Sequence, residues 1–227
     1  MSKPKLIIFA SGTSIKGGGG SGFEKLVENS RTNNLDAEIV AVVSNHENGG
    51  VRNRADKLEI PFIHFLGPFS ADEYERIVKP YHPCFIALSG WLKPVKGLSS
   101  DSDSIISAQR TLNIHPGPLP DFGGPGMYGH HVHEAVIAAF KRGEIKESAV
   151  SMHFVTEKYD DGPVFFHYPV KINISDTPES LAERVNRAEH FWQSYITRLV
   201  VSRGIRWDGR NPRSLIVPGM YEYHIKP

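Results

Sequence analysis

The sequence predicts an α/β protein built on an open, mostly parallel twisted sheet, with helices on both faces and antiparallel strands late in the chain. Two observations lead to this prediction: apolar, β-branched runs recur through the first half, and helix-like segments separate them. Near-continuous apolar runs suit strands covered on both faces, and alternation of strand and helix at this spacing favours right-handed βαβ units.

The strands and helices of the first half follow directly from these runs. Ser70 precedes Glu73 at capping-box spacing, which marks the start of the last helix in this half. The predicted strands lie at residues 5–10, 38–44, 61–65, 84–89 and 111–115, and the predicted helices at 23–33, 51–58 and 70–81.

The pattern changes after residue 115. A long helix is expected to begin at Thr177, because Pro178 and Glu179 suit a first turn, and to end near Ser202. Before it, the sequence predicts a helix at 131–143 and paired strands at 148–156 and 162–172. We expect a single domain over 1–227, made of a βαβ half (1–110), a second half (111–203) and a C-terminal arm (204–227).

Composition limits the classes of partner. Lys and Arg number 26 against 25 Asp and Glu, so no overall field favours nucleic acid or an anionic membrane, and any phosphate must be bound locally. The first apolar run is only about five residues long, too short for a signal peptide or a membrane span, so we expect a cytoplasmic protein. The lone Cys84 stands in an apolar stretch, which predicts a buried, unreactive thiol.

A glycine-rich loop, SGTSIKGGGGSG at 11–22, follows the first strand and opens the first helix. A Walker A loop needs Lys and Ser or Thr after its last glycine, but here Gly22 precedes Phe23. The G-x-G-x-x-G pattern also matches, yet in a four-glycine run this is nearly automatic. The second strand moreover ends in Ser44 and Asn45, where a dinucleotide site needs an acid.

A monophosphate site is therefore the preferred interpretation of this loop, because backbone N–H groups at the start of a helix attract anions. A flexible turn without a ligand is the alternative. The groups expected at the phosphate are Ser11, Gly12, Thr13, Gly20, Ser21 and Gly22, with Lys16 as a further cation.

Asn113 and His115 are two residues apart on a predicted strand, so their side chains leave one face near its carboxyl end. That edge of an open α/β sheet is where ligands usually bind. Pro116, Pro118 and Pro120 lock φ along the exit path and so restrict the motion of the pair. An amide donor beside an imidazole suits acyl or formyl transfer, in which a carbonyl oxygen becomes negative.

Other polar residues have a simpler structural interpretation. Asp160 could supply an acid, but from spacing alone a hairpin turn is the first interpretation of the Asp160–Asp161 pair. His153 stands inside an apolar strand, which predicts a buried, hydrogen-bonded histidine rather than a catalytic one. Three further histidines fit a polar helix start and pocket lining better than a metal site, because their spacing does not match H-E-x-x-H; they are His130, His131 and His133.

Taken together, the segments LNIHPGPLP, SMHFVTEKYDDGPV and RVNRAEH resemble the formyltransferase family that uses 10-formyltetrahydrofolate. Within it, they most resemble the phosphoribosylglycinamide formyltransferases, and the resemblance covers residues 5 to about 202. It implies a Rossmann-like formyltransferase fold and a catalytic triplet of Asn113, His115 and Asp160. In the family two glycines follow the aspartate, whereas here Asp161 takes the place of the first.

The resemblance also implies binding residues. For the ribonucleotide substrate it implies the glycine loop, Pro116 and Glu189, which matches the acid that holds the sugar hydroxyls. Without the resemblance, Glu189 belongs to an exposed helical charge pattern. For the folate it implies Trp91, Leu92, Lys93, Pro94, Val155, Thr156 and Tyr159.

The activity implied is transfer of the formyl group of 10-formyltetrahydrofolate, as cosubstrate, to the amine of 5-phosphoribosylglycinamide in de novo purine synthesis. Asn113 and a protonated His115 are expected to stabilise the oxyanion while Asp160 orients His115. No metal, nicotinamide, nucleic acid or membrane is expected, and the oligomeric state is not predicted.

Two alternatives remain: a formyltransferase for another amine, such as an amino-sugar nucleotide, and a non-catalytic nucleotide-binding relative. A transfer-RNA formyltransferase usually has an extra C-terminal domain, and a formyltetrahydrofolate hydrolase an N-terminal regulatory domain. We expect neither, because the first strand starts by Lys5 and little chain follows residue 203.

Overall fold

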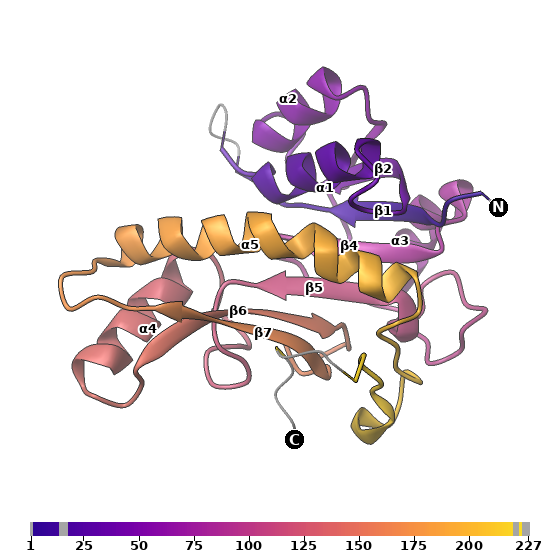
Figure 1. Ribbon diagram of the computed structural model, residues 1–227. Coiled ribbons are helices and arrows are strands. Elements are labelled where there is room, and N and C mark those ends of the chain that lie inside the picture. The colour runs from indigo at the N-terminus through magenta and orange to yellow at the C-terminus, as the bar shows by residue number, and fades with distance from the viewer. Residues whose placement is uncertain (1, 14–17, 220–222, 224–227) are drawn as a thin grey trace.

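The computed structural model describes residues 2–13, 18–219 and 223, which build one seven-stranded sheet in the order β3-β2-β1-β4-β5-β6-β7 (Figure 1). The first five strands of this order are parallel and the last two are antiparallel, so the predicted fold class is confirmed. The strands are β1 (Lys5–Phe9), β2 (Glu38–Ser44), β3 (Phe62–His64), β4 (Phe85–Ser89), β5 (Thr111–His115), β6 (Glu147–Phe154) and β7 (Val164–Lys171).

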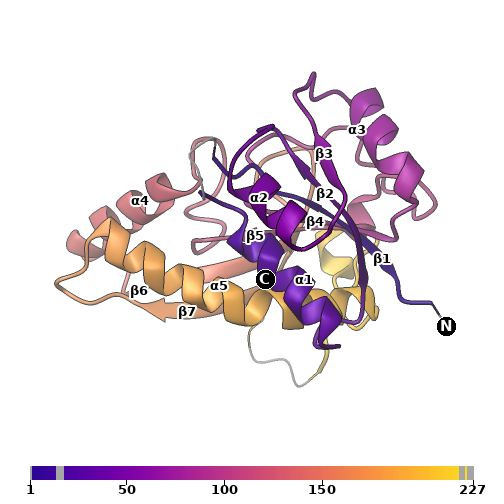
Figure 2. The same cartoon turned by 90° about the horizontal axis from the view of Figure 1, so that it is seen from above.

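Helices cover both faces of this sheet. Figure 2 shows α1 and α5 on one side of the strands and α3 on the other. The helices are α1 (Ser21–Arg31), α2 (Gly50–Lys57), α3 (Ala71–Val78), α4 (His130–Lys141) and α5 (Pro178–Val201), and a 3₁₀ turn, η1 (Lys79–Tyr81), follows α3.

Alternation along the central strand produces two separate cores. Leu6 and Ile8 of β1 belong to the core shared with α1, α4 and α5, whereas Ile7 and Phe9 belong to the core under α3. All four side chains are at most 1% exposed. This is the reason that the strand is apolar at every position from Leu6 to Phe9 rather than at alternate ones.

The helix starts agree with the predicted capping residues. The hydroxyl of Ser70 accepts a hydrogen bond from the backbone N–H of Glu73 at 3.4 Å, as expected. At α5, Thr177 and Ser180 form a reciprocal capping box, a partner that the sequence analysis did not identify.

Two features near the ends of strands complete the fold. Cys84 is exposed, so the prediction of a buried thiol is wrong; it lies just before β4, where its backbone N–H donates to the carbonyl of Lys5 at 2.9 Å. In the C-terminal arm, the carbonyl of Tyr223 accepts from the N–H of His167 in β7 at 2.7 Å.

The expected division of the domain at residue 110 stays a prediction, and the pairing of β4 with β5 crosses that point.

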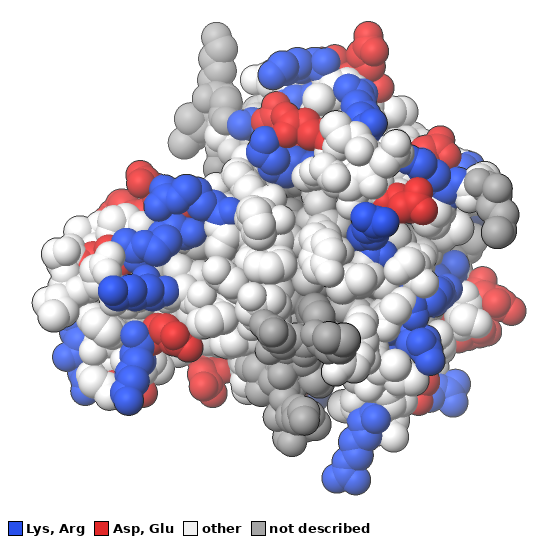
Figure 3. Space-filling view, viewed as in Figure 1, with Lys and Arg blue, Asp and Glu red and all other residues white. Residues whose placement is uncertain are grey.

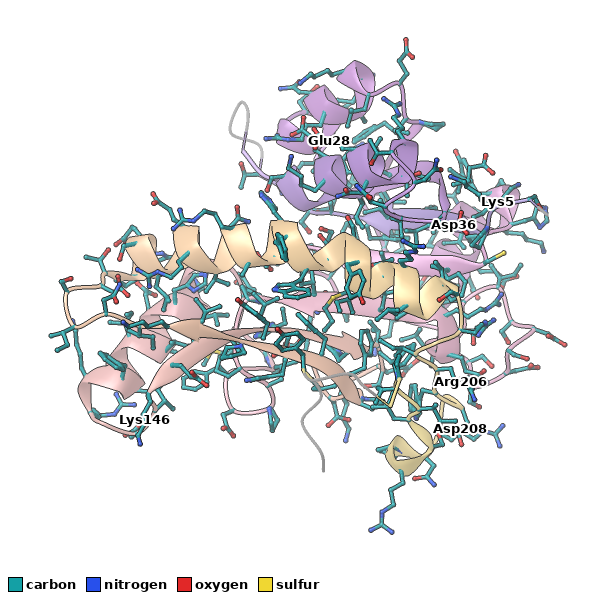
Figure 4. All side chains as sticks on the ribbon, in the orientation of Figure 1. Lys5, Glu28, Asp36, Lys146, Arg206 and Asp208 are labelled. Carbon is teal, nitrogen blue, oxygen red and sulfur yellow. The ribbon has the colours of Figure 1, made fainter. Side chains whose placement is uncertain are left out.

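Charged side chains of both signs are interspersed on the face that carries α5 (Figure 3). The residues labelled in Figure 4, such as Lys146 and Arg206, are exposed at the outer edges of the ribbon. In the part of the chain that the structure describes, no helix is both long enough and apolar enough to cross a membrane.

Candidate active site

Three segments meet at the carboxyl edge of the parallel strands. The strand order reverses at β1, which has β2 on one side and β4 on the other, and ligands in open α/β sheets bind at such a point. Beyond the strand ends, the N–H of Ser11 donates to the carbonyl of Gly90 at 2.9 Å. The glycine loop after β1 and the segment after β4 therefore lie side by side, with the end of β5 next to them.

Asn113 and His115 of β5 both face Asp160, which lies on the turn between β6 and β7. The Nδ2 atom of Asn113 is 3.4 Å from Oδ1 of Asp160, and the Nδ1 atom of His115 is 3.8 Å from Oδ2. His115 is only 3% exposed. The structure thus brings together the three residues of the predicted triplet.

The loop after β5 folds back over this triplet. The Nε2 atom of His115 is 2.7 Å from the carbonyl oxygen of Phe122, and the N–H of Gly124 donates to Oδ2 of Asp160 at 3.0 Å. Asp160 has a φ of 52°, in the left-handed region that aspartate tolerates better than most residues. A Cβ at Gly123 would lie 2.5 Å from Leu119, so glycine permits this close approach.

His153 is a member of the site that the sequence analysis assigned only to the core. It is 2% exposed, and its Nδ1 atom is 2.7 Å from the carbonyl oxygen of Phe154. Its Nε2 atom is 3.1 Å from Nδ2 of Asn113 and 3.4 Å from Oδ1 of Asp160. The antiparallel pairing of β5 with β6 sets His153 opposite Asn113, and spacing along the chain gave no signal of this pairing.

The charges in the site are set by burial and by each other. Burial lowers the pKa of His115, although the Asp160 carboxylate and the Phe122 carbonyl act in the opposite direction. Burial alone raises the pKa of Asp160, but His153, His115 and the Gly124 N–H together keep it below its usual value. Desolvation therefore favours the neutral form of the His115 ring over the protonated form.

The departure from the family's aspartate-glycine-glycine pattern has a simple structural basis. Asp161 is exposed and does not have a positive φ, so this position needs no glycine. Gly162 is different, because a Cβ there would lie 1.7 Å from the carbonyl oxygen of Phe154.

A pocket opens directly beside the triplet. Asn113, His153 and Asp160 are among the residues that line it. Of the seven residues expected at the folate, six line this pocket, namely Trp91, Lys93, Pro94, Val155, Thr156 and Tyr159; Leu92 does not and is 39% exposed.

The comparisons with known proteins show the family of the chain. The family model described as formyl transferase matches residues 5–199. The chain belongs to the formyl transferase family. It is 32% identical over 214 residues to the chloroplastic phosphoribosylglycinamide formyltransferase of Arabidopsis thaliana, covering 90% of this chain and 68% of that protein.

Two further relatives extend the comparison of this formyl transferase. The phosphoribosylglycinamide formyltransferase of Bacillus subtilis is 29% identical, covering 83% of this chain and 90% of that protein. The crystal structure of phosphoribosylglycinamide formyltransferase from Bacillus halodurans superposes with a TM-score of 0.71 at 26% identity, covering 88% of this chain and 96% of that one.

The glycine loop of this formyl transferase turns tightly at its described ends. The carbonyl of Gly18 accepts from the N–H of Gly50 at 3.1 Å and from that of Thr13 at 3.4 Å. Gly20, with a φ of 83°, precedes α1, and among the residues that the structure describes no side chain caps the first turn there. Ser11 is buried and its hydroxyl accepts from the N–H of Leu92, so its side chain joins two segments of the site.

The rest of the predicted phosphate loop surrounds this turn. Gly12 has a φ of 62° and, with Thr13, precedes residues 14–17. Ser21 and Gly22 form the first residues of α1. Lys16 lies outside the described residues.

Two other predicted substrate residues border the site. Glu189 lies on the part of α5 that contacts the start of α1, since Nε2 of the adjacent His190 is 3.0 Å from Oγ of Ser21. Neighbouring atoms desolvate the carboxyl of Glu189 and raise its pKa to about 7. Pro116 is half-buried and directly follows His115.

The three histidines at the start of α4 point in different directions. His130 and His131 are exposed and lie 3.4 Å and 3.2 Å from oxygens of Glu134. His133 is 5% exposed, and burial lowers its pKa to about 4. Within the described ranges, no group of three or more His, Cys, Asp or Glu residues is placed to hold a metal ion.

Proposed function

We propose that this chain transfers the formyl group of 10-formyltetrahydrofolate to the glycinamide amine of 5-phosphoribosylglycinamide, a step of de novo purine synthesis. The observation that carries the proposal is the convergence of Asn113, His115 and Asp160, two of which, Asn113 and Asp160, also line the pocket that Trp91 lines. The names of the Arabidopsis and Bacillus relatives support this choice of acceptor. The cytoplasmic location stays a prediction, because one of these relatives is named as chloroplastic.

The amide of Asn113 stabilises the negative charge that develops in the reaction. When the amine nitrogen attacks the formyl carbon, a carbon–nitrogen bond forms and the formyl oxygen becomes an oxyanion. The Nδ2–H of Asn113 donates to this oxygen in place of its long 3.4 Å contact with Asp160. One such donor contributes about 100- to 1,000-fold in rate.

His115 carries the proton between the two nitrogens. Because the resting imidazole is neutral, its Nδ1 atom can take the proton that the attacking amine loses. The imidazolium is stabilised by the carboxylate of Asp160 and by the carbonyl of Phe122, and it adds its charge to oxyanion stabilisation. The intermediate then collapses, the bond from carbon to N10 breaks, and N10 takes that proton.

Binding far from the reacting atoms positions the amine. The glycine loop, from Ser11 to Gly22, binds the phosphate, and Glu189 binds the ribose hydroxyls. The pocket lined by Trp91 and Tyr159 holds the folate, so the formyl carbon lies beside Asn113. Fixing both reactants in this way supplies much of the rate, because the reaction becomes effectively unimolecular. The scheme uses no metal ion and no nicotinamide.

An acceptor panel tests the reaction. The protein is mixed with 10-formyltetrahydrofolate and, separately, with glycinamide ribonucleotide or an amino-sugar nucleotide, and release of tetrahydrofolate is followed. We expect the higher kcat/KM with glycinamide ribonucleotide. Preference for the amino-sugar nucleotide contradicts the proposed acceptor, and no turnover with any amine contradicts the enzyme itself.

Two substitutions test the triplet. His115→Ala and Asp160→Asn are each expected to lower kcat by at least about 100-fold, the contribution typical of a positioned proton-transfer group. His64→Ala is the control, because His64 is exposed on β3. Near-normal turnover in both variants removes these residues from the mechanism.

A further inference from the structure

The wall of the pocket formed by residues 91–95 lies in no helix or strand, so the sheet ladder does not fix its shape. Two residues that do not line the pocket hold it from outside. Ser11 accepts a hydrogen bond from the N–H of Leu92 at 2.9 Å, and the hydroxyl of Tyr74 donates to the carbonyl of Pro94 at 3.0 Å.

Tyr74 contacts this wall at two points. Its hydroxyl also accepts a hydrogen bond from the indole Nε1–H of Trp91 at 2.9 Å. Trp91 and Pro94 both line the pocket. Because proline has no N–H, the carbonyl is the one backbone group through which Pro94 can be held by a hydrogen bond.

The ring of Tyr74 is itself firmly placed. It is 1% exposed on α3, and its centroid lies 5.0 Å from that of Phe65 and 5.7 Å from that of Phe9. Trp91 contacts the same Phe9 at 5.3 Å. Burial raises the pKa of Tyr74 well above its ordinary value, so the hydroxyl keeps its proton at neutral pH and remains a donor to Pro94.

We propose that Tyr74 is a positioning residue for the formyl donor, whose hydroxyl fixes the indole of Trp91 and the carbonyl of Pro94 before the folate binds. This inference rests on the proposed function, because it takes the pocket to be the folate site. A wall fixed in advance favours the bound ground state and the transition state equally, so its loss raises KM without lowering kcat.

Tyr74→Phe removes the hydroxyl and keeps the ring. We expect the KM for 10-formyltetrahydrofolate to rise by roughly fivefold to thirtyfold, the effect of leaving buried hydrogen-bonding groups unpaired. We expect kcat to stay within about threefold and the KM for the amine acceptor to stay unchanged. Tyr81→Phe is the matched control, because Tyr81 packs against the same core and its hydroxyl has no hydrogen bond within the described chain.

Trp91→Phe is a second variant that removes the indole N–H and leaves the Pro94 contact in place. It is expected to raise the donor KM. In the double variant with Tyr74→Phe, the fold increase in donor KM is expected to be smaller than the product of the two single increases, because the two substitutions remove the same hydrogen bond. If Tyr74→Phe does not fold, Trp91→Phe alone decides: an unchanged donor KM overturns the inference.

Titration with tetrahydrofolate separates this inference from the proposed function. If the wild-type protein neither binds tetrahydrofolate nor transfers the formyl group, the proposed function fails. If the wild-type protein does both and Tyr74→Phe binds tetrahydrofolate equally well, only the role of Tyr74 fails. An equal rise in KM for both substrates also overturns that role, because it indicates general loosening of the fold.

Discussion

Asn113 and His153 lie directly opposite each other on neighbouring antiparallel strands, and Nδ2 of Asn113 is 3.1 Å from Nε2 of His153. The other ring nitrogen of His153 is 2.7 Å from the carbonyl of Phe154. The Phe154 carbonyl places a proton on Nδ1, and in the tautomer with its only proton there, Nε2 is an acceptor for the Asn113 amide. His153 therefore fixes which end of the Asn113 carboxamide faces the site.

His153→Phe removes this acceptor and keeps a ring of similar size. We expect kcat to fall by about tenfold to a hundredfold, because a misoriented Asn113 donor costs roughly 1–3 kcal/mol. His153→Gln is expected to recover part of the loss, since a side-chain carbonyl can accept the same hydrogen bond. Steady-state kinetics of both variants check this, and a normal kcat in His153→Phe contradicts it.

The part of the site that depends on short-range spacing was predictable from the sequence. The shared face of Asn113 and His115 follows from the pleat of a single strand, and the glycine loop from its place between β1 and α1. Asp160 could be assigned to the triplet only from the family resemblance, because its spacing alone favoured an ordinary hairpin turn.

The contacts that the sequence could not predict join segments far apart in the chain. The role of His153 depends on the register of β6 against β5, which a whole loop and helix separate. The same holds for the Phe122 carbonyl and the Gly124 N–H, which reach the triplet only when the loop folds back. The register of an antiparallel pair is set by the burial pattern of both strands and by the geometry of the turn. Neither can be predicted from the residue type at a single position.

His133 is expected to make the fold sensitive to acid. Its pKa is about 4 in the folded protein and near 6.5 when unfolded, so the unfolded chain takes up a proton first as the pH falls. The free energy of unfolding therefore decreases between about pH 6.5 and pH 4, by up to roughly 3 kcal/mol from this residue.

Urea unfolding of the wild type and of His133→Leu at pH 7 and pH 5 measures this effect. The loss of stability between the two values is expected to be smaller in the variant by about 2 kcal/mol. His64→Leu is the exposed control and is expected to lose as much as the wild type. Equal losses in His133→Leu and the wild type contradict the assignment.

Glu189→Ala is expected to raise the KM for the ribonucleotide by about tenfold to a hundredfold, because hydrogen bonds to a charged group contribute roughly 1.5–3 kcal/mol.

Since the pKa of Glu189 is about 7, its carboxyl is mostly neutral below that pH. The wild-type KM for the ribonucleotide is therefore expected to rise as the pH falls from 8 to 6. Glu183→Ala, at an exposed position of the same helix, is the control. A change confined to the folate KM means that Glu189 does not bind the sugar.

Substitutions at the adjacent positions 161 and 162 are expected to differ in their effect on kcat and stability. Asp161→Gly restores the family pattern but changes only an exposed residue whose 3.9 Å contact with Lys158 is solvent-screened. We expect kcat within about twofold and a stability change below about 1 kcal/mol, as is usual for surface sites.

Gly162→Ala places a methyl group 1.7 Å from the carbonyl oxygen of Phe154, so the backbone at the end of β6 must shift. Overpacking of this kind costs about 3 kcal/mol. The shift also displaces His153, which precedes Phe154, and Asp160, so kcat is expected to fall along with the thermal midpoint. Calorimetry and kinetics of the two variants check the pair. If Asp161→Gly proves the more damaging change, the turn that carries Asp160 is not held by close approach at Gly162.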